Sequence, residues 1–169
     1  KTLVSFLEPE EGKGNLLLMN GNDLWFYANS TSRPIRITPI QRLSGATSFG
    51  DLASLGWSKD YTINQMEEII ITVKDKPIES YVFNLIAKSS GATYQKVQLW
   101  IDKKNHQPIK SEVFLTSGRL YKTLDFTKYE VVSGKVVNSE IVFTDNFNKQ
   151  KKSILKFIKF KEEKNLPNR

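Results

Sequence analysis

The sequence contains no cysteine, a single histidine and no long run of apolar residues. Without cysteine, disulfide frameworks, zinc–thiolate sites and cysteine nucleophiles are excluded. His106 lies in the polar stretch "KKNHQP", which predicts an exposed turn residue and leaves no pair of imidazoles for a metal site or a Ser-His-Asp triad. No segment approaches the roughly 18 apolar residues of a membrane helix. We therefore expect no metal, no cofactor and no catalytic set.

Two patterns that resemble catalytic signatures do not fulfil them. "EGKGN" (Glu11–Asn15) lacks the spacing and the following helix of a phosphate loop, and it predicts a turn. The paired glutamates lie in polar stretches, where nothing raises a carboxyl pKa for general-acid work. We predict that the protein is not an enzyme and that it binds by burying apolar surface.

The length and charge of the chain limit the number of domains and the classes of partner that we expect. At 169 residues, 39% hydrophobic and 25% charged, the chain predicts one globular domain over residues 1–169. The formal charge of +7 is concentrated near the C-terminus, in "NKQKKSILKFIKFKEEKN". These lysines indicate an edge strand protected from pairing, or contact with anionic headgroups or a membrane surface. No nucleic-acid motif accompanies them, so nucleic acid is not an expected partner.

Alternating apolar residues dominate the chain and predict strands. In "YQKVQLWIDKKNHQPIKSEVF" (Tyr94–Phe114) two alternating runs flank a polar turn, as in a hairpin. One apolar row is expected to face a core or a ligand: Val97, Leu99, Ile101, Ile109, Val113 and Leu115. Further turns are predicted at 20–22, 74–76 and 133–134, the spacing of an antiparallel meander.

One strand and one helical segment modify this pattern. "DLWFYAN" (Asp23–Asn29) is apolar on both faces, so it is either a central core strand or a strand with one face on a pocket. In "SFGDLASLGW" (Ser48–Trp57) apolar residues have near-helical spacing: Phe49, Leu52, Leu55 and Trp57. We expect one or two short helices there, with Thr47 or Ser48 as the N-cap. The economical fold is mainly β, a curved antiparallel sheet whose concave face this segment covers.

Four segments of the chain resemble the LolA-like outer-membrane lipoprotein-sorting family, in particular its LolA-like domains of unassigned cargo. They are Leu3–Leu17, Asn22–Ile37, Leu99–Lys110 and Gly118–Tyr129, followed by the closing "NLP". The resemblance implies a half-open β-barrel with helices plugging its mouth, in a periplasmic carrier of acyl chains or lipid-modified proteins. The chain departs from the family in the helical stretch, and it lacks the N-terminal helix and first strands. The chain opens on "KTLVSFLEPEE" with neither an initiator Met nor a signal peptide, so we expect it to be part of a longer sequence.

This reading predicts a binding surface and partners. The apolar cavity is expected to be lined by Leu24, Phe26, Leu52, Phe83, Leu99, Ile101, Val113, Phe126 and Phe143. The resemblance suggests that Arg33 and Arg36 lie near the mouth of the pocket, where they would contact a headgroup. The expected ligand is a lipid or lipoprotein acyl chain, and an inner-membrane transporter, an outer-membrane acceptor protein or a peripheral membrane contact would complete the transfer. The alternative is a periplasmic sensor or interaction module that docks a membrane transporter or regulator.

Overall fold

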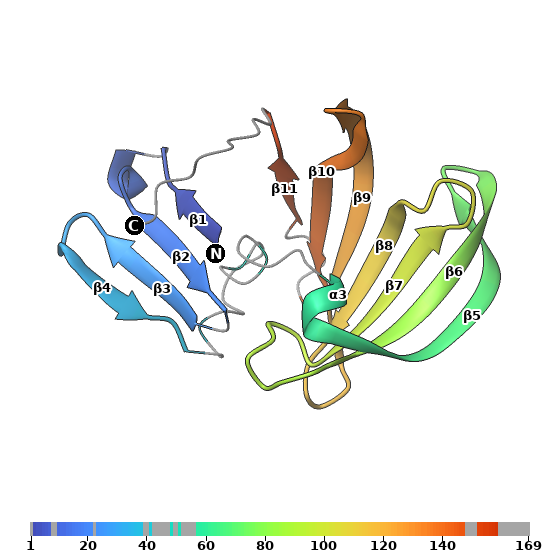
Figure 1. The fold of residues 1–169 in the computed structure, drawn as a ribbon, viewed down its shortest axis with the longest axis horizontal. Coiled ribbons are helices and arrows are strands. Elements are labelled where there is room, and N and C mark those ends of the chain that lie inside the picture. The colour runs from blue at the N-terminus through green and yellow to red at the C-terminus, as the bar shows by residue number, and fades with distance from the viewer. Residues whose placement is uncertain are drawn as a thin grey trace.

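The protein folds into two antiparallel sheets, as seen in a computed structural model (Figure 1). The structure describes residues 2–7, 10–21, 23–38, 41, 48, 51, 57–147 and 152–158. Within these residues, no helix has both the length and the apolar character needed to cross a membrane. The predicted mainly β, half-open architecture is confirmed, with the curved sheet divided into two.

The strands follow one another as hairpins. The four-stranded sheet has the order β1-β2-β3-β4, and the seven-stranded sheet has the order β11-β10-β9-β8-β7-β6-β5. The strands are β1 (Thr2–Ser5), β2 (Leu16–Asn20), β3 (Asp23–Ala28), β4 (Arg33–Arg36), β5 (Tyr61–Val73), β6 (Lys76–Ala87), β7 (Lys96–Asp102), β8 (Pro108–Phe114), β9 (Leu120–Val132), β10 (Lys135–Asp145) and β11 (Lys152–Lys156). One 3-10 turn (Glu10–Gly12) and one short helix, α3 (Trp57–Asp60), complete the described elements.

The predicted turns are confirmed. Lys74 and Asp75 join β5 to β6 with φ of 49° and 63°, and Ser133 and Gly134 join β9 to β10 with φ of 49° and 76°. Two successive residues with positive φ match the right-handed twist of the flanking strands. The hairpin registers that these turns fix decide which side chains share a face.

Each sheet has its own apolar core. In the seven-stranded sheet three residues of the predicted row are buried, with Val97 2%, Leu99 4% and Val113 0% exposed; Ile109 was wrongly assigned to this row, because a register shift beside it places it in the groove lining. Ile101 packs against the same cluster. The opposite face is not purely polar, because Trp100 is only 9% exposed. The seven-stranded sheet therefore has apolar surface on both sides.

Two helix starts lie between β4 and β5, and the second of them lies in the stretch predicted to be helical. Thr38 and Gln41 exchange hydrogen bonds, and so do Ser48 and Asp51, in the reciprocal arrangement of a capping box. The predicted N-cap at Ser48 is thus confirmed. Of the predicted apolar helix residues, Trp57 begins α3 and packs on the core, whereas Phe49, Leu52 and Leu55 lie outside the described residues.

A buried ion pair ties this segment to the seven-stranded sheet. Lys122 Nζ on β9 lies 2.8 Å from Asp51 Oδ2, and the two side chains are 0% and 1% exposed. The same carboxylate accepts hydrogen bonds from the backbone and hydroxyl of Ser48 and from the Tyr94 hydroxyl. Burial, and then the charge of Asp51, raise the pKa of Tyr94, which keeps its phenol protonated as a donor. Both carboxylate oxygens of Asp51 therefore have partners, which offsets the cost of burying the charge.

Because each partner compensates the other, we expect Lys122→Met to lower the free energy of unfolding by about 3–5 kcal/mol, leaving Asp51 buried without its cation. The double variant Lys122→Met with Asp51→Leu should recover much of that loss. Urea denaturation followed by circular dichroism measures both. Equal destabilisation in the single and double variants would contradict the pairing.

Candidate ligand-binding groove

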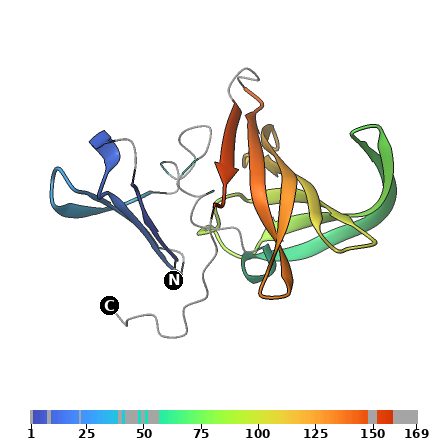
Figure 2. The same ribbon diagram turned by 90° about the horizontal axis from the view of Figure 1, so that it is seen from above.

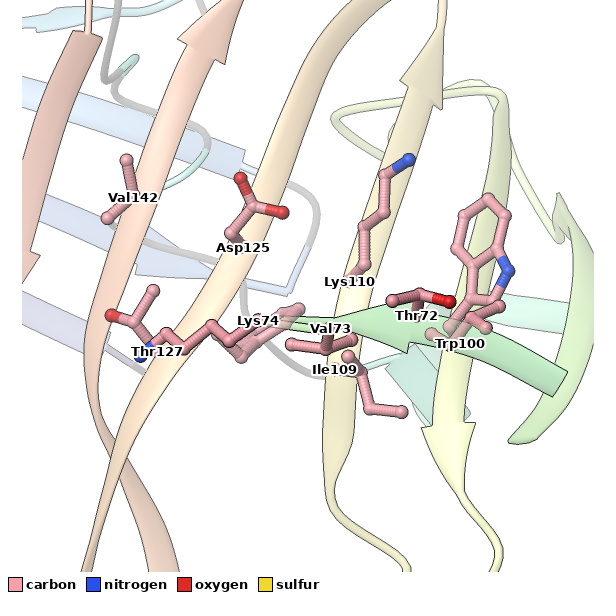
Figure 3. Close-up of a pocket in the computed structure, with 11 residues that line it drawn as sticks. Thr72, Val73, Lys74, Trp100, Ile109, Lys110, Asp125, Thr127 and Val142 are labelled. Atoms are coloured by element: carbon pink, nitrogen blue, oxygen red, sulfur yellow. The ribbon is translucent and has the colours of Figure 1, made fainter. Parts of the chain in front are cut away.

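An open groove of about 710 Å³ lies on the face of the seven-stranded sheet that carries Trp100 (Figure 3). Its walls come from the end of β5 and its turn, and from β7, β8, β9 and β10. The lining residues are Ile71, Thr72, Val73, Lys74, Trp100, Ile109, Lys110, Asp125, Phe126, Thr127 and Val142. The volume falls in the range of small-molecule pockets, and most of the lining is apolar.

The groove exists because the β5–β6 hairpin curls. These two strands are 13 and 12 residues long, and Figure 2 shows them bending away from the other strands. Ile71 and Val73, near the hairpin tip, thereby line the same groove as Val142 on β10. A register shift between β7 and β8 leaves Ile109 without a cross-strand partner on β7. Ile109 is one of the residues that line the groove.

A lysine next to an aromatic ring marks the polar side of the groove. Lys110 Nζ lies 4.9 Å from the centre of the Trp100 ring and 2.5 Å from Glu112 Oε1. A cation at this distance from an indole is attracted by the ring quadrupole. Figure 3 shows Lys110 and Trp100 side by side along adjacent strands. The groove thus offers an ammonium group beside an aromatic wall.

Asp125 is the unusual group of this surface. It is half-buried and stands opposite Lys110 in the β8–β9 register. Burial raises the pKa of its carboxyl group, while Lys110 and Lys152 partly offset that rise. Among the residues that the structure describes, no side chain hydrogen-bonds or ion-pairs with it. A half-buried carboxyl group in an apolar groove is a candidate functional group.

The predicted cavity residues divide between three environments. Leu99, Val113 and Phe143 are fully packed in the core of the seven-stranded sheet, and Phe83 and Ile101 lie partly buried at its margin. Phe126 packs on that core and also lines the groove. Leu24 and Phe26 belong to the separate core of the four-stranded sheet, and Leu52 lies outside the described residues.

The two arginines are exposed on β4, the outer edge of the four-stranded sheet. Arg36 forms an ion pair with Asp23, and Arg33 is opposite Ala28 in register. Figure 1 shows β4 at the far side of the molecule from β5 and β7–β10. The groove and the arginines are therefore separate surfaces, and a role of the arginines at a pocket mouth stays a prediction.

Sequence reasoning missed most of the groove. Trp100, Lys110 and Asp125 lie on the face opposite the predicted apolar row, together with the polar residues Gln98, Asp102 and Glu112. The available signal was the bulky Trp100 in an otherwise polar row. The described residues contain no cluster of three metal-binding side chains.

Comparison with known proteins assigns the family. A LolA superfamily protein of Nitrosomonas europaea is 32% identical, with a TM-score of 0.83, over 98% of this chain and 73% of its own. The chain therefore belongs to the LolA superfamily, which confirms the predicted resemblance. A family model described as an uncharacterized protein matches residues 1–169. No curated protein matches the sequence.

Two more distant structures share the fold. A putative outer membrane lipoprotein-sorting protein domain of Vibrio parahaemolyticus is 22% identical, with a TM-score of 0.70, over 90% of this chain and 66% of its own. A DUF1329 family protein of Desulfovibrio piger is 18% identical, with a TM-score of 0.68, over 94% of this chain and 72% of its own. The curved two-sheet architecture is thus common to all three structures.

Because burial disfavours the ionised form of Asp125, we expect Asp125→Asn to stabilise the fold slightly at neutral pH, by less than about 1 kcal/mol given solvent screening. The unfolded chain titrates near the usual pKa of 3.8, and the folded chain titrates above it. The gain should therefore be full above the raised pKa and vanish below 3.8, where both states are protonated. Thermal melts across pH, with Glu11→Gln as an exposed control, measure it; a gain that persists in acid would contradict the assignment.

Proposed function

We propose that the protein is a periplasmic carrier that binds the acyl chain of a lipid or lipoprotein in the groove between the β5–β6 hairpin tip and β7–β10. Membership of the LolA superfamily supports the carrier class. The printed description of the Vibrio relative, a lipoprotein-sorting domain, supports the cargo class. The observation that carries the proposal is the open apolar groove beside an otherwise filled core. Residues 1–169 would act as one binding domain.

The groove divides into an apolar and a polar part. Ile71, Val73 and Val142 would contact the chain, because all three are apolar and line the groove. Lys110 and Lys74 would contact a phosphate or carboxylate headgroup at the open side. At roughly 25 cal/mol per Å², burial of about 300 Å² of chain contributes about 7 kcal/mol before the costs of association.

The residues predicted from the sequence would act in two ways. Phe126 lines the groove and would contact the ligand, whereas Phe83 and Ile101 are partly buried against the core and are not among the groove-lining residues. Leu99, Val113 and Phe143 would support the sheet from its other face, since they are already fully packed.

Filling the groove should abolish binding. We expect Val142→Trp to reduce the affinity for a fluorescent fatty acid at least about tenfold, because the indole occupies the space of the chain. Thr144→Trp is the matched control, as it lies two residues along the same strand and face but outside the lining. Fluorescence titration of each variant measures binding, and circular dichroism confirms that the variant is folded. No saturable binding by the wild-type protein, or equal loss in the two variants, would contradict the proposal.

A further inference from the structure

The tip of the β9–β10 hairpin carries exposed valines on both faces. Val131 and Val136 are cross-strand partners on one face and are 72% and 48% exposed. Val132 and Val137 lie on the opposite face and are partly exposed. Figure 2 shows this hairpin projecting from the seven-stranded sheet. Four valines therefore gather around the Ser133–Gly134 turn without being covered by either core.

The two-sided arrangement limits what could cover it. A strand that is apolar on both faces needs apolar surroundings on both sides. A flat protein surface covers one face of a projecting hairpin and leaves the other in water. The interface of a bilayer surrounds the tip from all sides, so it can cover the Val131–Val136 pair together with Val132 and Val137, whose cross-strand partners are Lys135 and Glu130.

Basic side chains lie behind the valines. Lys128 on β9 and Lys156 on β11 share one carboxylate, at 2.8 Å and 3.8 Å from Glu140 Oε2. Both lysines are more than half exposed, at 63% and 61%. The hydrogen bond from Lys128, followed by that from Thr127, lowers the pKa of Glu140, which therefore stays ionised and fixes the two ammonium groups in place.

Around the tip three lysines face two glutamates, which leaves one positive charge in excess. Two lysines share one carboxylate, and Lys135 adds a further exposed ammonium next to the turn. Glu130 is exposed on the tip and opposes this charge. Lys128 precedes Val131 by three residues, about 10 Å along a strand, which matches the depth at which interfacial segments place their apolar residues.

We propose that the tip of the β9–β10 hairpin inserts into the interface of an anionic bilayer, with its valines at the acyl boundary and Lys128, Lys135 and Lys156 against lipid phosphates. This contact is distinct from the groove and does not depend on its ligand. It would bring the protein to a membrane surface whether or not the groove is loaded.

A site-specific probe tests the insertion directly. The sequence has no cysteine, so Ser133→Cys accepts a single environment-sensitive fluorophore at the turn. Vesicles of phosphatidylglycerol and phosphatidylcholine should shift its emission to shorter wavelength, and vesicles of phosphatidylcholine alone should not. The same label on Thr31→Cys, in the β3–β4 turn at the far sheet, is the control and should not shift. An unshifted label at Ser133 or an equal shift at both positions would overturn the proposal.

Variants then separate the apolar and electrostatic contributions in vesicle sedimentation. Val131→Ser with Val136→Ser should weaken binding at least about tenfold, because both apolar contacts are lost. Ile35→Ser, which removes an exposed apolar side chain (53%) from β4, should leave binding unchanged.

The charge variants should change vesicle binding in opposite directions. Lys135→Ala should weaken binding about fivefold at low salt, and Glu130→Gln should strengthen it. Fatty-acid binding in the groove should be unchanged in all these variants, which distinguishes failure of this contact from failure of the carrier function. Vesicle binding that is insensitive to the valine and charge variants, with the folds intact by circular dichroism, would assign membrane contact to another surface and overturn the proposal.

Discussion

The buried ion pair between Lys122 and Asp51 is the constraint on which the arrangement of the seven-stranded sheet depends. It joins a residue that precedes α3 to the start of β9, and Tyr61 at the entry to β5 belongs to the core. The hydroxyl of Tyr61, the first residue of β5, donates to the backbone carbonyl of Tyr94, and the hydroxyl of Tyr94 donates to Asp51. A chain of satisfied polar groups thus fixes where β5 starts.

The two faces of the seven-stranded sheet consequently have different roles. One face is a packed core in which Val113 and Phe143 have no exposed surface. The other face is partly covered by its own curled hairpin, which leaves the groove open between Val73 and Val142. A carrier must hold cargo without losing its fold when empty. Separating the core from the binding surface meets both requirements.

Local patterns predicted much of the fold but little of the groove. Alternation and turn chemistry were enough to place Val97, Leu99 and Val113 on one buried face and to locate the turn at Ser133. The same alternation places Trp100 on the opposite face among polar residues, and periodicity cannot reveal that a distant hairpin curls over that face. The contact of Ile71 and Val73 with β8–β10 joins residues far apart in the sequence, and no local rule encodes it.

The central claim is that the acyl chain lies in the groove rather than within either core. Anomalous diffraction from crystals grown with a bromine-labelled fatty acid tests it most directly, since bromine reports the position of the chain without a mutation. The account predicts bromine density between Val73, Trp100 and Val142. Density confined to the apolar cores beside Leu24 or Leu99, with the groove empty, would contradict it.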